Sequence, residues 1–366
     1  MNVRELTDQI TVKLAAEVQR NGNMIPYIAE DGVYKTDMRQ KNLSWWTNGF
    51  WAGLLWQMYN ATENDSFKTT AEKTEIWLDK AMADFMGLHH DVGFMWMLSA
   101  VADYRLTGNE KSRTRALHAA ALLAGRYNPN GRFIRAWSGD KTGWMIVDCL
   151  MNLSLLYWAS DQTGDPRYTE IAQNHADTAL RVLLRPDGSC NHIAVLDPVT
   201  GELVDAPAGQ GYASGSSWSR GQAWAVYGFA LSAKHTGEAQ YLEAAKRSAH
   251  YFIANAAAHS WEPLVDFRAP ESPELLDMSA GAIAACGLLE LEKQVPTYEK
   301  KLYHDAAEHL LNAIAEKHLD LVPETDGIVL DSTADYHKDI HTRMIYADYY
   351  FVEGLLRLQG KELFAW

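Results

Sequence analysis

Residues 144–160 read WMIVDCLMNLSLLYWAS, a segment of helical length that is apolar on nearly every side. A helix with this pattern is covered on all sides by other parts of the protein. A turn follows at Thr163 and Gly164, and residues 163–180, TGDPRYTEIAQNHADTAL, alternate between an apolar and a polar face. The stretch therefore predicts a helical hairpin with a covered inner helix and a half-exposed outer helix. It leaves one question, which is why the inner helix carries a carboxylate, Asp148.

The same order of apolar helix, Thr-Gly turn and amphipathic helix recurs at Thr107 and Thr236, and less regular copies lie near Asn60 and Val295. The final segment GKELFAW lies where the end of a sixth copy is expected. Uneven spacing argues against a solenoid of identical units and favours hairpins joined by variable loops. We therefore predict an all-α (α/α)6 barrel, a toroid of inner and outer helices.

Segments with strand character are few, and the best are short apolar runs at 192–196 and 327–330. Linkers rich in Pro, Gly or Ser are lacking, and composition does not shift along the chain. We therefore expect residues 1–366 to form a single catalytic domain.

The chain has 366 residues, of which 47% are hydrophobic and 22% charged, as in globular proteins with a large core. A formal net charge of -14 argues against nucleic acid as a partner. The charged first residues and the lack of a long apolar run predict a cytoplasmic protein without a membrane segment. Three scattered cysteines predict neither a disulfide framework nor a zinc site.

Four side chains occupy equivalent places in successive inner helices. Trp46, Asp91, Asp148 and Arg220 each lie about 16 residues, or roughly 24 Å of helix, before the following turn. They should therefore sit at the same end of their helices and converge on one mouth of the barrel. Helix N-termini at this mouth would also favour a bound anion.

The two aspartates are candidates for acid–base chemistry. Apolar neighbours of Asp148, including Trp144 and Ile146, would remove water from its carboxyl group and favour the neutral form, which can donate a proton. The simpler alternative is that Asp148 and Asp91 are helix N-caps. Their equal offset from two similar turns favours a functional role over that alternative.

Asp91 follows His89 and His90 in the segment HHDVGF. Neighbouring residues rarely point toward one ion, and no H-x-x-x-H spacing is present. We therefore expect no metal site here.

The loop and helix at 209–228, GQGYASGSSWSRGQAWAVYG, combine hydrogen-bonding side chains, ring faces and the planar guanidinium of Arg220, which suits a carboxylate. Tryptophans near inner-helix starts suit stacking on sugar rings, although packing of the barrel accounts equally well for at least half of them. They are Trp45, Trp46, Trp137, Trp218 and Trp224. His192, on a loop after an outer helix, could reach the same mouth.

Five ordered motifs make the chain resemble the unsaturated glucuronyl hydrolases of glycoside hydrolase family 88. They are WTNGFWAG (46–53), HHDVGF (89–94), WMIVDCLMNLSLLYWAS (144–160), SWSRGQAWAVYGFA (217–230) and MIYADYYFVEGLLRL (344–358). The resemblance covers nearly the whole chain. It implies an (α/α)6 barrel that removes the 4,5-unsaturated uronic acid left by polysaccharide lyases from unsaturated uronyl disaccharides or oligosaccharides, without a metal or an organic cofactor.

Position by position, the resemblance places the acid/base aspartate of the family on Asp148 and its second essential aspartate on Asp91. It also implies a set of substrate-binding residues: Trp46, His90, Trp137, His192, Gln210, Arg220, Trp224 and Tyr346. Gln210 and Arg220 match the residues that bind the sugar carboxylate. Tyr346 is the weakest transfer, since His341 and Arg343 lie nearby in the sequence.

Three alternatives stay open at this stage. An unsaturated rhamnogalacturonyl hydrolase would share the barrel and the reaction but act on pectin fragments. An N-acylglucosamine 2-epimerase-like isomerase would use paired histidines where this mouth offers paired aspartates. A sugar-binding protein without activity would keep the tryptophans but has no need of a desolvated acid.

Overall fold

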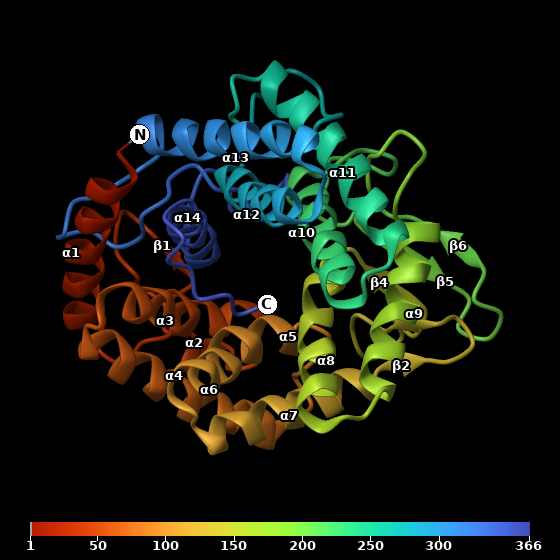
Figure 1. The fold of residues 1–366 in the computed structure, drawn as a ribbon, viewed down its shortest axis with the longest axis horizontal. Coiled ribbons are helices and arrows are strands. Elements are labelled where there is room, and N and C mark those ends of the chain that lie inside the picture. The colour runs from red at the N-terminus through yellow and green to blue at the C-terminus, as the bar shows by residue number, and fades with distance from the viewer. Residues whose placement is uncertain (1) are drawn as a thin grey trace.

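The computed structural model describes residues 2–366, which form a closed ring of helices in two layers (Figure 1). The inner layer consists of α3 (Phe50–Thr62), α5 (Val92–Trp96) with its continuation through α6 (Ala102–Thr107), α8 (Cys149–Thr163), α10 (Ser219–Thr236), α12 (Met278–Gln294) and α14 (Ile345–Leu358). The outer layer consists of α1 (Val3–Asn21), α4 (Asp65–Asp84), α7 (Glu110–Ala124), α9 (Arg167–Val182), α11 (Ala239–Ala258) and α13 (Thr297–Lys317). Each inner helix contacts the next, and α14 closes the ring against α3. The predicted (α/α)6 barrel is confirmed.

Burial separates the two layers as the sequence pattern predicts. In α10, every residue from Ser219 to Ala233 is buried, so this helix has no solvent-facing side along most of its length. In α9, the buried residues recur every three or four positions, as in Ile171, His175 and Ala179. The outer helices therefore seal the barrel, and the inner helices bring their side chains to its axis.

The Thr-Gly turns end three inner helices in the same way. Gly108, Gly164 and Gly237 have φ angles of 73°, 71° and 71°, a left-handed conformation that glycine adopts without steric cost. The less regular copies end differently: α3 has Glu63 at φ 59°, and α12 ends at Val295 with extended backbone. This variety is why the repeat is uneven in sequence.

The sixth hairpin differs from the expectation. The segment GKELFAW follows the inner helix α14 as coil, and the N-terminal helix α1 packs on α14 as the sixth outer helix. The C-terminal Trp366 is fully buried inside the barrel, where its ring lies parallel to that of Tyr350 at 6.1 Å. The ring is thus closed by both ends of the chain. Among residues 2–366, no helix is long and apolar enough to cross a membrane.

Short strands cap the inner helices at their N-terminal side. The strand β4 (Trp144–Ile146) pairs with β5 (Ile193–Leu196), which pairs with β6 (Leu203–Asp205). The strand predicted at 192–196 is therefore confirmed, whereas 327–330 forms only an isolated bridge through Val329. Residues 144–146 are strand and not the first turn of the predicted helix, because their backbone hydrogen-bonds to β5.

Two more strand pairs and three short helical segments complete the described chain. The pairs are β1 (Ile28–Ala29) with β7 (Arg343–Met344), and β2 (Tyr127–Asn128) with β3 (Phe133–Ile134). The short segments are α2 (Met38–Lys41), the 3-10 turn η1 (Trp46–Gly49) and η2 (Met97–Val101), a π-helical stretch that interrupts the second inner helix between α5 and α6. A continuous inner helix was expected there.

Candidate active site

Asp91 and Asp148 occupy the residue before the first turn of α5 and α8, but neither side chain caps its helix. Asp148 has φ -56° and ψ -28°, and Asp91 has φ -72° and ψ 5°; no backbone N–H of either helix donates to these carboxylates in the described structure. A capping residue would hold an extended backbone and accept such a bond. The capping alternative therefore does not explain these two acids, and both carboxylates are available for other contacts.

Asn152 connects the two aspartates. Its Nδ2 donates to Oδ1 of Asp91 at 3.3 Å and to the backbone carbonyl of Asp148 at 3.2 Å. Its Oδ1 accepts from the backbone N–H of Phe94 at 2.7 Å. The two helices approach closely here because Gly93 faces Asn152: a Cβ atom at Gly93 would lie 2.4 Å from Oδ1 of Asn152. One fully buried amide thus fixes the start of α5 relative to α8.

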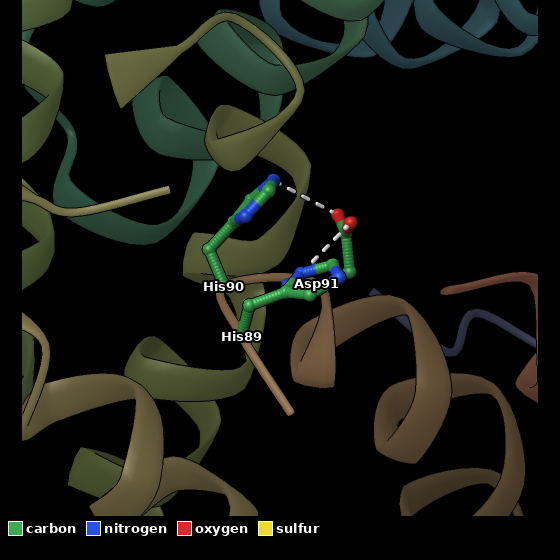
Figure 2. A group of neighbouring side chains, drawn as sticks. All are labelled: His89, His90 and Asp91. Atoms are coloured by element: carbon green, nitrogen blue, oxygen red, sulfur yellow. Dashed lines mark hydrogen bonds and ion pairs between the residues drawn. The ribbon is translucent and has the colours of Figure 1, made fainter. Parts of the chain in front are cut away.

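Two histidines flank the carboxylate of Asp91 (Figure 2). Nε2 of His90 lies 3.1 Å from Oδ1, and Nδ1 of His89 lies 3.3 Å from Oδ2. Burial favours the neutral acid, but the imidazoles and Asn152 outweigh it and lower the pKa of Asp91. For His90, burial also opposes the charge, yet Asp91 raises its pKa. Asp91 is therefore held as an anion beside His90.

The ligand atoms of His89, His90 and Asp91 all lie within 4.8 Å of one another. The expectation that such neighbours would point apart is wrong, because the chain turns at Asp91 before α5 begins and directs the carboxylate toward one nitrogen of each ring (Figure 2). The three side chains converge on a single point at the mouth of the barrel.

Asp148 has a different environment. Its side chain is 14% exposed, and Oδ2 lies 3.5 Å from Nε2 of His192 without a hydrogen bond to any described residue. Nδ1 of His192 accepts from the backbone N–H of Gln210 at 3.0 Å, so the ring proton sits on Nε2, facing Asp148. The carboxyl group of Asp148 therefore keeps an oxygen free while His192 sets its direction. The strands β4 and β5 hold these two residues in register.

Arg220 lies in the first turn of α10 and is almost fully buried. Its guanidinium binds Asp277 at 2.9 Å and donates to the backbone carbonyls of Thr333 and Ala334. The sequence suggested that the guanidinium of Arg220 is free to bind a carboxylate, whereas some of its N–H groups already donate to protein acceptors. Asp277, the N-cap of α12, was not among the residues expected at this mouth. It lies two positions further from the turn at Val295 than the offset of about 16 residues that locates the other rim side chains.

The aromatic candidates differ in how much of their side-chain surface is exposed. Trp46 and Trp137 keep part of their surface accessible, and their rings contact Tyr346 at 5.0 Å and His90 at 6.1 Å respectively. Trp224 has no exposed surface and packs on Phe94 at 5.1 Å, as the packing alternative predicts.

Tyr346 is equally buried, with its hydroxyl group next to the sulfur of Met344. Gln210 is half-buried, and its amide donates to the backbone carbonyl of Ala334. Both residues therefore lie at the mouth with their polar groups directed to protein partners.

Successive contacts connect the sequence-predicted residues to one another. From Asp148 the chain of contacts passes through His192 to Trp218 (4.3 Å between rings), then to Arg220 (4.5 Å) and Tyr346 (5.2 Å). Tyr346 contacts Trp46, and Asn152 joins Asp148 to Asp91. The N-terminal ends of the inner helices therefore bring these side chains to one mouth of the barrel, and their roles stay a prediction.

A closed double ring of helices defines an (α/α)6-barrel protein, with two carboxylates in unlike environments at one mouth. The sequence profile of Glycosyl Hydrolase Family 88 matches residues 19–363. The chain is 37% identical over 363 residues to the unsaturated glucuronyl hydrolase of Bacillus sp. (strain GL1), covering 94% of this chain and 93% of that protein. The chain belongs to glycoside hydrolase family 88, and it is a glycosidase.

Two further similarities extend this result. The chain is 36% identical to the unsaturated chondroitin disaccharide hydrolase of Streptococcus pyogenes serotype M1, covering 85% of this chain and 80% of that protein. The crystal structure of the Bacillus sp. GL1 enzyme superposes with a TM-score of 0.91 at 34% sequence identity, covering 97% of this chain and 96% of the other.

Proposed function

We propose that this glycosidase removes the 4,5-unsaturated glucuronic acid from the non-reducing end of lyase-generated glycosaminoglycan oligosaccharides by hydrating the C4=C5 vinyl ether. The observation that carries the proposal is the contrast between two carboxylates joined by Asn152. Asp91 is held as an anion by His90, whereas Asp148 keeps an oxygen free of protein partners. One stable anion and one acid with a free oxygen suit a reaction that first protonates an alkene and then activates water.

In the proposed reaction, the carboxyl group of Asp148 gives its proton to C4 of the unsaturated sugar. Positive charge develops at C5, next to the ring oxygen. The carboxylate of Asp148 then takes a proton from water as the water oxygen bonds to C5, which restores the acid. The resulting hemiketal opens and releases the neighbouring sugar as an alcohol. One water molecule is consumed, so the atoms balance without a cofactor.

Asp91 carries the second proposed role. Its charge would stabilise the cation that develops at C5 or hold a sugar hydroxyl group. His90 and Asn152 keep this carboxylate ionised and oriented. The distance rule that separates retaining from inverting glycosidases does not apply, because no displacement occurs at the anomeric carbon.

We assign the substrate-binding role to the other predicted residues at this mouth of the barrel. Trp46 and Trp137 offer partly exposed rings for the sugar faces. Arg220 and Gln210 would bind the uronate carboxylate through the N–H groups that their protein acceptors leave free, and His192 would contact the ligand beside Asp148.

Tyr346 and Trp224, which are both buried, complete the assigned substrate-binding set. Tyr346 lies under Trp46, and buried Trp224 has an Nε1 atom without a described protein partner.

Relatives support the substrate class. One solved relative is an Asp-to-Asn variant complexed with dGlcA-GalNAc6S, and several curated relatives are unsaturated chondroitin disaccharide hydrolases. An unsaturated rhamnogalacturonyl hydrolase is the second candidate, since it would use the same acid pair on pectin fragments. An epimerase would need two histidines on opposite sides of one carbon, whereas His89 and His90 both face Asp91.

The deciding experiment is a turnover panel of lyase-derived disaccharides that differ in linkage, sulfation and sugar class, including rhamnogalacturonan fragments. Loss of the ultraviolet absorbance of the conjugated double bond reports the reaction. Turnover of glycosaminoglycan products in preference to pectin products is expected. Preference for the pectin products would favour the second candidate, and no loss of absorbance with any of them would overturn the proposal.

Reaction in heavy water tests the chemistry. Deuterium should appear at C4 of the released uronic acid, because the proton that Asp148 transfers comes from solvent. A product without label at C4 would exclude protonation of the alkene. We also propose that the protein acts in the cytoplasm, which fractionation of the producing cells with an antibody would check.

A further inference from the structure

Three nitrogen and oxygen ligand atoms converge at the mouth of the barrel, and two of them come from neighbouring imidazoles. Nδ1 of His89 and Nε2 of His90 lie on either side of the carboxylate of Asp91, at 3.3 and 3.1 Å from its oxygens (Figure 2). The rings of the histidines stack at 5.1 Å with an angle of 29° between their planes. Their nitrogens therefore face the same side.

His90 is oriented by its second nitrogen. Nδ1 lies 2.9 Å from the backbone carbonyl of Ala136, which requires the ring proton to be on Nδ1. Nε2 thus faces the carboxylate of Asp91 at 3.1 Å, and it would coordinate a metal ion that takes the place of the proton between the two groups. A carbonyl group behind a coordinating imidazole is the usual arrangement of metal-bound histidines, because it fixes both tautomer and ring direction.

We propose that His89, His90 and Asp91 form a binding site for a transition-metal dication of the zinc class. Two imidazoles and one carboxylate are the donor set that zinc prefers, and oxygen-seeking Mg²⁺ and Ca²⁺ do not favour it. Tetrahedral zinc places its ligand atoms about 3.4 Å apart. The two imidazole nitrogens lie 3.3 and 3.1 Å from different oxygens of Asp91. With one ligand atom from each residue, all three atoms lie within 4.8 Å of one another, so small side-chain rotations bring them into range.

All three protein ligands lie in the segment directly before α5, so the fourth position of such an ion would be open to the mouth of the barrel. Binding would displace any proton shared between His90 and Asp91 and would take the Asp91 carboxylate out of the sugar site. The ion would therefore inhibit the enzyme, reversibly and in competition with substrate. This consequence rests on the proposed function, whereas the binding itself does not.

Calorimetric titration of the tag-free, chelator-treated protein with ZnCl₂ tests the site directly. One ion per chain is expected, with an affinity that 10 mM MgCl₂ does not change. The His89→Gln variant should bind at least tenfold more weakly, because glutamine supplies no imidazole. The matched control is His118→Gln, at an exposed histidine of α7, which should bind as the unchanged protein does. Equal affinity of the two variants, or no saturable binding, would overturn the proposal.

A spectroscopic measurement covers the case in which a variant folds poorly. CoCl₂ added to the unchanged protein should give the intense visible absorption of tetrahedral cobalt, and ZnCl₂ should abolish it. Only the weak bands of octahedral cobalt would contradict the proposed donor set. Inhibition is measured separately on a turned-over disaccharide and should be reversed by EDTA. Binding without inhibition would overturn the competitive role, and an inactive protein that still binds zinc would count against the proposed function alone.

Discussion

Nδ2 of Asn152 lies 3.3 Å from Oδ1 of Asp91, so an amide on α8 holds the carboxylate at the start of α5. The same amide reaches the backbone of Asp148 and the N–H of Phe94. The separation of the two acids is therefore set by a buried side chain between two inner helices.

The Asn152→Ala variant should keep its fold but lose about 10- to 100-fold in kcat, with little change in KM, because Asp91 would lose an orienting donor. Leaving the N–H of Phe94 unpaired should lower the free energy of unfolding by about 1–3 kcal/mol. Steady-state kinetics and urea unfolding check both effects. Ser154→Ala, on the same helix and away from the acids, is the control; an equal loss of kcat there would contradict the positioning role.

Asp148→Asn should lower kcat by about 10³-fold or more while substrate binding measured by calorimetry is retained, because the amide cannot donate the proton. Asp91→Asn should also lower kcat. A substitution of His90 should then change the rate less than it does in the unchanged protein. Near-native turnover of Asp148→Asn would refute its assignment as the acid. In urea unfolding, the free energies of unfolding of both variants should lie within about 1 kcal/mol of that of the unchanged protein.

Asp277→Ala should be strongly destabilising, by about 3–5 kcal/mol, because Arg220 would keep a buried charge without its anion. The exposed pair of Glu110 and Arg113 gives a matched control, and Glu110→Ala should cost less than about 1 kcal/mol. Urea unfolding of the two variants measures the difference. Equal costs would show that the buried pair contributes no more than a surface pair.

Gly93→Ala tests the close approach of α5 and α8. The added Cβ atom would lie 2.5 Å from Cα of Asn152, so the backbones must separate, at a cost of about 1–3 kcal/mol and with loss of activity. Gly281→Ala in α12 is the matched control, since its Cβ atom would meet nothing nearer than 3.4 Å. That variant should be neutral or up to about 1 kcal/mol more stable. Thermal unfolding and turnover separate the two outcomes.

Stability should fall as the pH rises from about 7 to about 8, where the buried histidines with lowered pKa values, such as His175, are neutral in both the folded and the unfolded chain. Burial raises the pKa of Glu17 from 4.5 to about 8, and burial likewise raises the pKa of Asp348 to about 7. The folded protein therefore binds more protons than the unfolded chain in this window, and its free energy of unfolding falls with rising pH. Glu17→Gln should make that slope smaller without abolishing it, because burial also raises the pKa of Glu75 to about 8. Asp8→Asn, exposed on the same helix, should leave the slope unchanged; an equal slope in Glu17→Gln and the unchanged protein would contradict the prediction.

The single domain predicted for residues 1–366 stays a prediction. One cooperative transition, coincident by circular dichroism and tryptophan fluorescence, would support it. Two separated transitions would contradict it.

The barrel could be predicted from sequence because burial on every side leaves a local signal. An inner helix such as 149–163 is apolar all round, and Gly164 ends it by its left-handed conformation. The rim position of Asp148 and Asp91 followed from the fixed rise of a helix between rim and turn. These features depend on neighbours along the chain, so a linear pattern records them.

Contacts between distant segments left no such record. Asp277 pairs with Arg220 on a neighbouring inner helix. Helix α1 completes the outer ring against α14, which lies near the other end of the chain.

The sequence by itself determined the layered helices, the end at which the acids lie and the family of the enzyme. Only the tertiary structure decided which partners those acids have: an amide and two imidazoles for Asp91, and one imidazole with a free oxygen for Asp148. The physical reason is that charge and hydrogen bonding act over a few ångströms in space, whereas hydrophobic periodicity acts along the helix and can be read from the chain.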